Sequence, residues 1–182
     1  MPNSIERACR TGRAVPRSYS VRVAVLTLEF EREIEFPRVI VWDALVDEDL
    51  VSGWLADAEI EPELGGDYCL HWVLEPARSR TLAHIVLLQR PECLAVEATD
   101  LALRFDLDEI PGGTRGTSTR LRLAVRLELE PAGTARAKAD WLTRLDQLRD
   151  LLYGQPVNWA TWGSDMQQTW SQHLGEVGGS TA

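Results

Sequence analysis

Tryptophan is the residue type in this sequence best suited to bind a flat ligand, because the chain has seven of them against three Phe and three Tyr. An indole ring offers a large apolar face, and such rings both fill cores and line ligand pockets. Alternation and helical spacing place Trp54, Trp72 and Trp141, together with Trp42, on faces expected to point inward. We predict Trp54, Trp72 and Trp141 as ligand-binding residues, with simple filling of the core as the alternative for each.

Polar residues also share the inward phase of the predicted strands. Arg32 is in register with Leu28 and Ile34, where an unpaired buried guanidinium would be costly. It therefore pairs with an inward carboxylate, reaches water at a bulge, or binds an anionic or carbonyl oxygen of a ligand. The hydroxyls of Tyr68 and Thr119 can donate to a ligand or to a backbone group. We predict Arg32 and Tyr68 as further ligand-binding residues.

The histidines and the glycine-rich segment do not predict a catalytic or metal-binding set. His71 and His84 are expected to lie opposite each other on adjacent strands if the turn between them centres on residues 77–78. Two imidazoles can bind a metal, but no third ligand stands in register, so an ordinary cross-strand pair is expected. Residues 112–117 lack the Gly-Lys-Ser/Thr ending of a phosphate-binding loop and predict a hairpin loop. We predict no catalytic residue, no metal and no cofactor.

Charge and composition exclude several classes of partner. The 182 residues include 19 Lys and Arg against 28 Asp and Glu, which gives a net charge of −9 and opposes binding to nucleic acid or to an anionic membrane. The three cysteines are an odd number without C-x-x-C spacing, so no disulfide framework is expected. No apolar stretch reaches membrane-spanning length and no secretory signal is evident. We therefore expect a cytoplasmic protein.

The candidate residues require a sheet and a helix to position them. Residues 26–36 alternate between apolar and charged side chains, as expected of a strand with one wet face. Two short helices are predicted between Pro37 and Leu55, with Asp47 capping the second, and an antiparallel meander of strands extends to Leu129. Residues 138–153 change to helical spacing and place one apolar stripe against the sheet. The predicted fold is α+β, a curved antiparallel sheet of about seven strands around a long C-terminal helix.

Three segments are expected along the chain. Residues 1–22 carry a net charge of +4 and are expected to form a flexible basic arm. Residues 23–154 form the folded domain, and residues 155–182 form a Trp-rich tail with a short helix. The apolar stripe of this tail is too long to remain exposed to water. It packs on its own domain, covers a cavity mouth, or forms a homodimer with a second copy of the chain.

Several short motifs, in order along the chain, resemble a known family. They are FPRVIVWDALVD at 36–47, SGWL at 52–55, GGDY at 65–68 and RPECL at 90–94. Together they resemble the activator-of-heat-shock-protein-ATPase-like branch of the START-related (SRPBCC) superfamily, over about residues 24–154. The resemblance implies a helix-grip fold, in which a curved sheet grips the C-terminal helix, often around a cavity for an apolar small molecule.

The expected function is therefore the binding of an apolar small molecule between the sheet and the C-terminal helix, without catalysis. Two alternatives remain. The first is an enzyme of the polyketide cyclase or dehydratase kind, in which Arg32 and Tyr68 would polarise a carbonyl, although an inward acid or base is missing. The second is a co-chaperone-like interaction module that uses the acidic surface of residues 43–75.

Overall fold

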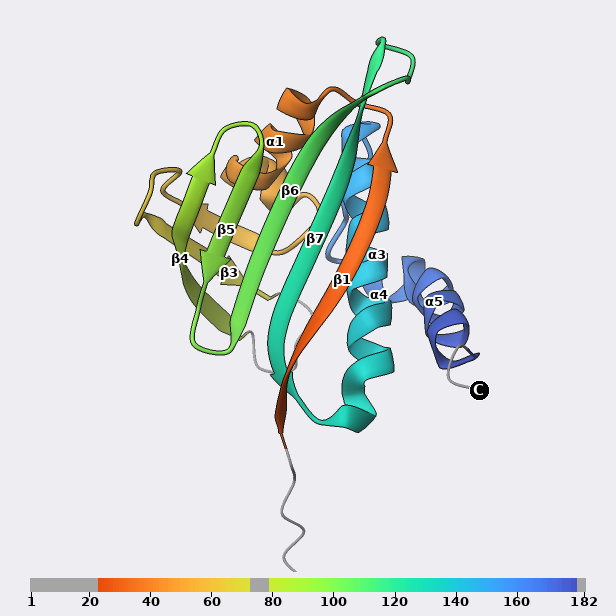
Figure 1. Ribbon diagram of the computed structural model, residues 1–182. Coiled ribbons are helices and arrows are strands. Elements are labelled where there is room, and N and C mark those ends of the chain that lie inside the picture. Colours follow the sequence, from red (N-terminus) through yellow and green to blue (C-terminus); the bar gives the residue numbers. More distant parts are fainter. Residues whose placement is uncertain (1–22, 73–78, 180–182) are drawn as a thin grey trace, which may run out of the picture.

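The computed structural model describes residues 23–72 and 79–179, which form one curved antiparallel sheet with helices on its concave side (Figure 1). The strand order is β1-β7-β6-β5-β4-β3-β2, so β1 and β2 are the edge strands. The predicted α+β class and seven-stranded curved sheet are confirmed, and the long C-terminal helix makes this a helix-grip architecture. The strands are β1 (Ala24–Ile34), β2 (Asp57–Ile60), β3 (Asp67–His71), β4 (Arg80–Gln89), β5 (Cys93–Glu97), β6 (Leu101–Pro111) and β7 (Thr117–Leu129).

Side-chain alternation sets the two faces of the sheet. On β1, Leu28 and Ile34 are buried, whereas Glu29, Glu31 and Glu33 are exposed on the convex face. Burying one apolar face of each strand provides the main favourable free energy of the fold. The opposite face carries paired charges, and it is the wet face that the sequence pattern predicts.

Two short helices follow β1 and fill the curve of the sheet. Helix α1 (Arg38–Val46) begins directly after Pro37, which is its N-cap residue. Helix α2 (Glu48–Ser52) begins after Asp47, whose carboxylate accepts a hydrogen bond from the Leu50 N–H at 3.1 Å. This confirms the predicted cap, which satisfies an N–H group that the helix itself leaves unpaired.

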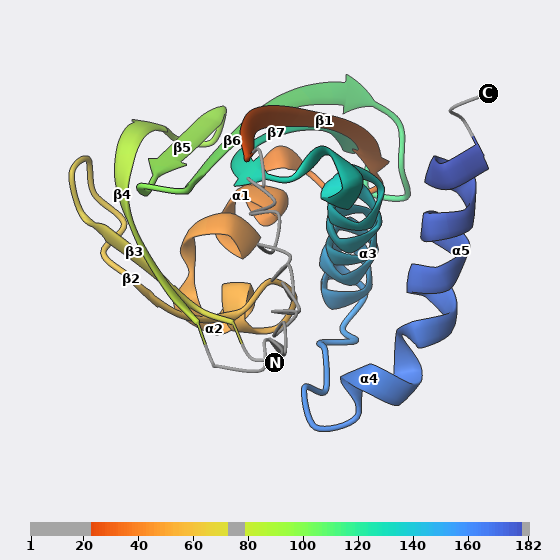
Figure 2. The same cartoon turned by 90° about the horizontal axis from the view of Figure 1, so that it is seen from below.

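Helix α3 (Thr134–Leu152) packs against the concave face, beside α1 and α2 (Figure 2). Its buried stripe includes Trp141, Leu145 and Leu148. The helix begins four residues before the predicted start at 138, because the 3-10 turn Pro131–Gly133 leads directly into it. Helix ends depend on local turns more than on the apolar stripe from which we predicted them.

The tail folds back onto its own domain. It contains α4 (Trp162–Asp165) and α5 (Gln167–Gly179), and α5 runs along the side of α3 that faces away from α1 and α2 (Figure 2). The indole of Trp170 donates to Asp140 Oδ1 at 2.6 Å, and His173 Nε2 lies 2.7 Å from Asp146 Oδ2. Near the start of the tail, the Trp159 indole donates to the Ser52 carbonyl at 2.8 Å. Packing on its own domain was one of the three arrangements expected for the tail, and these contacts are of that kind.

The turn between β2 and β3 leaves no space for a side chain at Gly66. A Cβ atom there would overlap the carbonyl oxygen of Glu61 and lie 3.0 Å from that of Glu63. The backbone cannot easily move away, because the Gly66 carbonyl accepts a hydrogen bond from Ile85 at 2.9 Å.

We expect Gly66→Ala to lower the free energy of unfolding by about 1–3 kcal/mol, the usual cost of forcing extra volume into a packed site. Urea unfolding would measure the change. The control is Gly163→Ala, since a Cβ there meets no atom within 4 Å. Equal stabilities of the two variants would contradict this account of the turn.

Candidate functional site

The strongest candidate site is formed by two indole rings that face one guanidinium group between the sheet and α3. The Arg144 guanidinium carbon lies 5.0 Å from the ring centre of Trp72 and 5.2 Å from that of Trp141. Both distances are within the range of an attractive cation–π interaction. We call these three residues the Trp-Arg cluster. It brings together two of the five predicted ligand-binding residues, Trp72 and Trp141.

The sheet side of the fold contributes Trp72 to this cluster, and α3 contributes Trp141 and Arg144. Trp72 follows directly after β3 and continues the inward phase of Tyr68 and Leu70. Trp141 and Arg144 are three residues apart on α3, a spacing that places them on neighbouring positions of one helix surface. Trp141 is buried and Trp72 is half-buried. The Trp72 indole N–H is already paired, since it donates to Thr81 Oγ1 at 2.9 Å, which fixes the orientation of the ring.

Arg144 is the member of the cluster that the sequence did not single out. The signal available was the i, i+3 spacing from Trp141, but that spacing alone does not show that a second tryptophan arrives from the sheet. Only the tertiary arrangement brings Trp72 within 5.0 Å of the same guanidinium.

Two other predicted ligand-binding residues lie in the core. Trp54 and Tyr68 are fully buried, and both donate to backbone carbonyls of α1. The Trp54 indole donates to the Ala44 oxygen at 2.9 Å, and the Tyr68 hydroxyl donates to the Leu45 oxygen at 3.0 Å. Burial raises the pKa of Tyr68 well above its ordinary value, so the hydroxyl stays protonated. These bonds anchor α1 to α2 and β3.

Arg32 and Thr119 keep the inward phase expected of them but differ in their surroundings. Thr119 is buried, and its hydroxyl donates to the Phe36 carbonyl at 2.7 Å. Arg32 is half-buried on edge strand β1, where its Nη1 donates to the Glu31 carbonyl at 3.1 Å. Because β1 and β3 are separated by four strands in the sheet order, Arg32 is not part of the Trp-Arg cluster.

The expected pairing of His71 with His84 is wrong. In the structure His71 pairs with Arg80, and His84 pairs with Asp67. The His84 Nδ1 atom lies 2.9 Å from Asp67 Oδ1. A shift of four residues in the register preserves which face each side chain occupies, so alternation alone could not detect it. The assumed turn at residues 77–78 lies outside the described residues.

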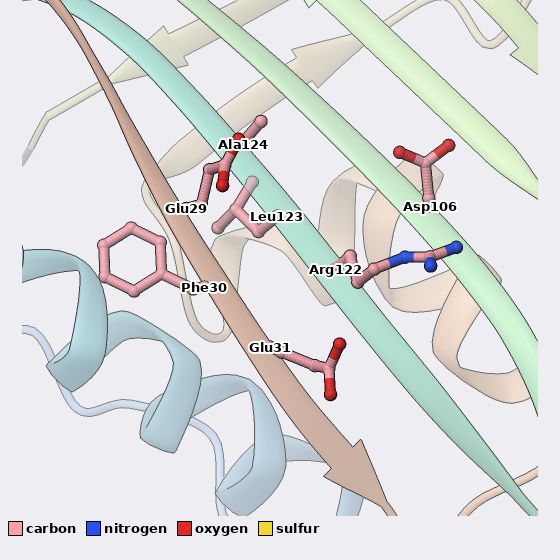
Figure 3. A pocket seen from close by; sticks show the side chains of 7 residues that line it. All are labelled: Glu29, Phe30, Glu31, Asp106, Arg122, Leu123 and Ala124. Carbon is pink, nitrogen blue, oxygen red and sulfur yellow. The ribbon is translucent and has the colours of Figure 1, made fainter.

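The described surface also contains a groove on the sheet beside β1, with a volume of about 350 Å³. Figure 3 shows that Glu31 and Arg122 extend to one side of the sheet, whereas Phe30 extends toward the helices. The groove is charged, and two of its lining residues form ion pairs: Arg104 donates twice to Asp106, which lowers the pKa of that carboxyl, and Arg122 lies 2.7 Å from Asp108. We interpret this groove as an exposed ion-pair network, which contributes little to stability.

Cys93, a thiol in the core, is expected to be unreactive in the folded protein. Burial raises its pKa to about 11, and only the thiolate is an effective nucleophile. We expect alkylation of Cys93 by iodoacetamide at pH 8 to be slow until the protein unfolds, with mass spectrometry of proteolytic fragments as the measurement. Alkylation of Cys93 at the rate of a small-molecule thiol under native conditions would contradict this.

Within the described residues, no helix is both long and apolar enough to cross a membrane. Comparison with protein-family models gives no match, and comparison with curated proteins gives none either.

Solved structures, in contrast, match well in fold. CalU16 from Micromonospora echinospora superposes with a TM-score of 0.62 at 15% identity, covering 88% of this chain and 97% of its own. The conserved protein of unknown function EF2215 from Enterococcus faecalis gives 0.58 at 18%, covering 85% and 86%. Protein MLL2253 from Mesorhizobium loti gives 0.58 at 20%, covering 72% and 100%. Identities this low support a shared fold and nothing finer, so the chain is an α+β protein with a helix-grip sheet.

Proposed function

We propose that this protein binds a small, mainly apolar molecule between the sheet and α3, with the Trp-Arg cluster at one end of the binding site. We also propose that it belongs to the START-related (SRPBCC) superfamily, in the branch resembling activators of heat-shock-protein ATPase. The motifs at 36–47, 52–55, 65–68 and 90–94 support the assignment, together with the helix-grip fold in which they lie.

The Trp-Arg cluster is the observation that carries the binding proposal. Trp72 follows β3 and Trp141 lies on α3, so rings from both layers contact the same Arg144 guanidinium. The Trp72 ring is only half-buried although it belongs to the inward-facing set. A planar apolar ligand stacks favourably on such a ring, and the guanidinium of Arg144 favours a carboxylate or carbonyl oxygen on that ligand.

The contacts of Tyr68 favour binding over catalysis. A cyclase-like reaction would use this hydroxyl to polarise a substrate carbonyl. The hydroxyl instead donates to the Leu45 carbonyl, and burial raises its pKa, so it is neither free to bind a substrate nor able to act as a base near neutral pH. We therefore propose a carrier or binding protein, acting in the cytoplasm.

We expect an apolar anionic dye, anilinonaphthalene sulfonate, to bind the folded protein with increased fluorescence. Trp72→Leu and Trp141→Leu should weaken its affinity about tenfold, since losing one stacked ring costs on the order of 1 kcal/mol or more. Native mass spectrometry of freshly purified protein would show any retained molecule, and its subunit count would test the alternative of a homodimer through the tail.

Trp170→Leu is the matched control, because it makes the same chemical change on α5, where the indole donates to Asp140. Near-ultraviolet circular dichroism must stay native in each variant, since the dye also binds partly unfolded states. Equal dye affinities for all three variants, or no dye binding to the folded protein, would refute the proposed site.

A further inference from the structure

A group of three different metal-ligand types lies on the convex face of the sheet, on the side opposite the Trp-Arg cluster. The donor atoms of Glu59, Cys69 and His71 all lie within 4.8 Å of one another. Cys69 and His71 are two residues apart on β3 and therefore share one face, and Glu59 pairs with Cys69 from edge strand β2. The backbone ladder thus fixes which three side chains meet.

The distances between donor atoms fit those around one tetrahedral ion. Cys69 Sγ lies 3.5 Å from His71 Nε2, and the same nitrogen lies 3.5 Å from Glu59 Oε1. Zinc bonds of about 2.3 Å to sulfur and 2.0–2.1 Å to nitrogen or oxygen place neighbouring tetrahedral ligands about 3.5 Å apart. The sulfur-to-carboxylate distance is at most 4.8 Å. The Glu59 side chain can adjust it, because 73% of that side chain is exposed.

Cys69 is a buried residue whose sulfur already accepts one hydrogen bond. This residue is only 2% exposed although it lies on the convex face, and Arg80 Nε donates to its sulfur at 2.8 Å. Arginine has no acceptor, so the sulfur must be the acceptor of this bond. N–H donors to sulfur are the hydrogen bonds that tune metal-bound thiolates.

We propose that Glu59, Cys69 and His71 bind a divalent transition-metal ion of the zinc class, with water in the fourth position. Sulfur, imidazole and carboxylate together suit Zn²⁺ and Co²⁺, and disfavour Ca²⁺ and Mg²⁺, which take oxygen ligands. The site is shallow, since the side chain of His71 is 38% exposed, and an ion can enter it from solvent. It is independent of the proposed ligand-binding function.

The test is a titration of the full chain with Co²⁺, in a Cys9→Ser, Cys93→Ala background that leaves Cys69 as the one thiol. We expect a thiolate-to-cobalt charge-transfer absorption that saturates at one ion per chain and disappears on addition of Zn²⁺. Cys69→Ser should abolish this absorption. His71→Gln and Glu59→Gln should each weaken metal affinity at least about tenfold, because each removes a direct ligand.

His84→Gln is the matched control, because His84 lies on the same face but pairs with Asp67. It should leave the cobalt titration unchanged. The unsubstituted protein provides a second measurement: Zn²⁺ should slow the alkylation of Cys69 and raise the thermal midpoint. The proposal is overturned if the chain binds no Co²⁺ below about 100 μM, if the absorption survives Cys69→Ser, or if His84→Gln weakens binding as much as His71→Gln.

Discussion

Trp54→Ala is expected to lower the free energy of unfolding by about 3–5 kcal/mol, the usual cost of removing a large aromatic side chain from a core. Trp54 is fully buried, and its indole donates to the Ala44 carbonyl of α1. The substitution therefore leaves a cavity and removes the bond that joins the segment after α2 to α1. Guanidinium chloride unfolding, followed by circular dichroism, would measure the change.

Two comparisons make this result specific. Trp54→Phe keeps most of the ring volume but removes the donor, so we expect a loss of about 1–2 kcal/mol. Leu64→Ala is the surface control, because Leu64 is 69% exposed, and it should change stability by less than about 0.5 kcal/mol. A fully stable Trp54→Ala protein that has lost only dye binding would instead support the direct ligand contact that the sequence predicts for Trp54.

Gln147→Leu is the second substitution expected to have a large effect, a loss of about 2–4 kcal/mol. Gln147 is buried on α3, and the amide orientation that satisfies both of its neighbours donates to the Trp54 carbonyl at 2.8 Å and accepts from the Trp162 indole. Leucine fills a similar volume but leaves the Trp54 carbonyl and the half-buried Trp162 indole without this partner. A buried unpaired group costs about 1–3 kcal/mol. The residue therefore links the core to the tail.

A double-mutant cycle would isolate this link. Trp162→Phe removes the indole donor, so the added cost of Gln147→Leu should be smaller in that background, with a coupling energy of about 1 kcal/mol. Urea unfolding of the four proteins gives the required values. Strict additivity would show that the tail does not depend on this bond.

The sequence was sufficient to predict most of the sheet, because one apolar face repeats with a period of two. The burial of Leu28 and Ile34 beside the exposed Glu29, Glu31 and Glu33 is the pattern from which β1 was predicted. Burial of that face determines which alternate side chains point inward, and a short segment of sequence is enough to show this alternation.

Contacts between distant segments could not be predicted from the local apolar pattern. The spacing of two residues puts Cys69 and His71 on one face of a strand, but only the β2–β3 register brings Glu59 beside them. We expected His71 to lie opposite His84, but the register between β3 and β4 places His71 opposite Arg80. Turn geometry sets such registers, and the apolar pattern repeats too regularly to distinguish one even shift from another.

The position of β1 at the edge of the sheet affects how the protein behaves at high concentration. An edge strand is a template on which a second chain can add a strand. If two copies paired antiparallel through β1 about Glu31, the two Glu31 side chains would face each other and Glu29 would face Glu33 on the same surface. Like charges directly opposite are destabilising. The carboxylates that keep this face of β1 exposed to water therefore also oppose aggregation by strand pairing at the β1 edge.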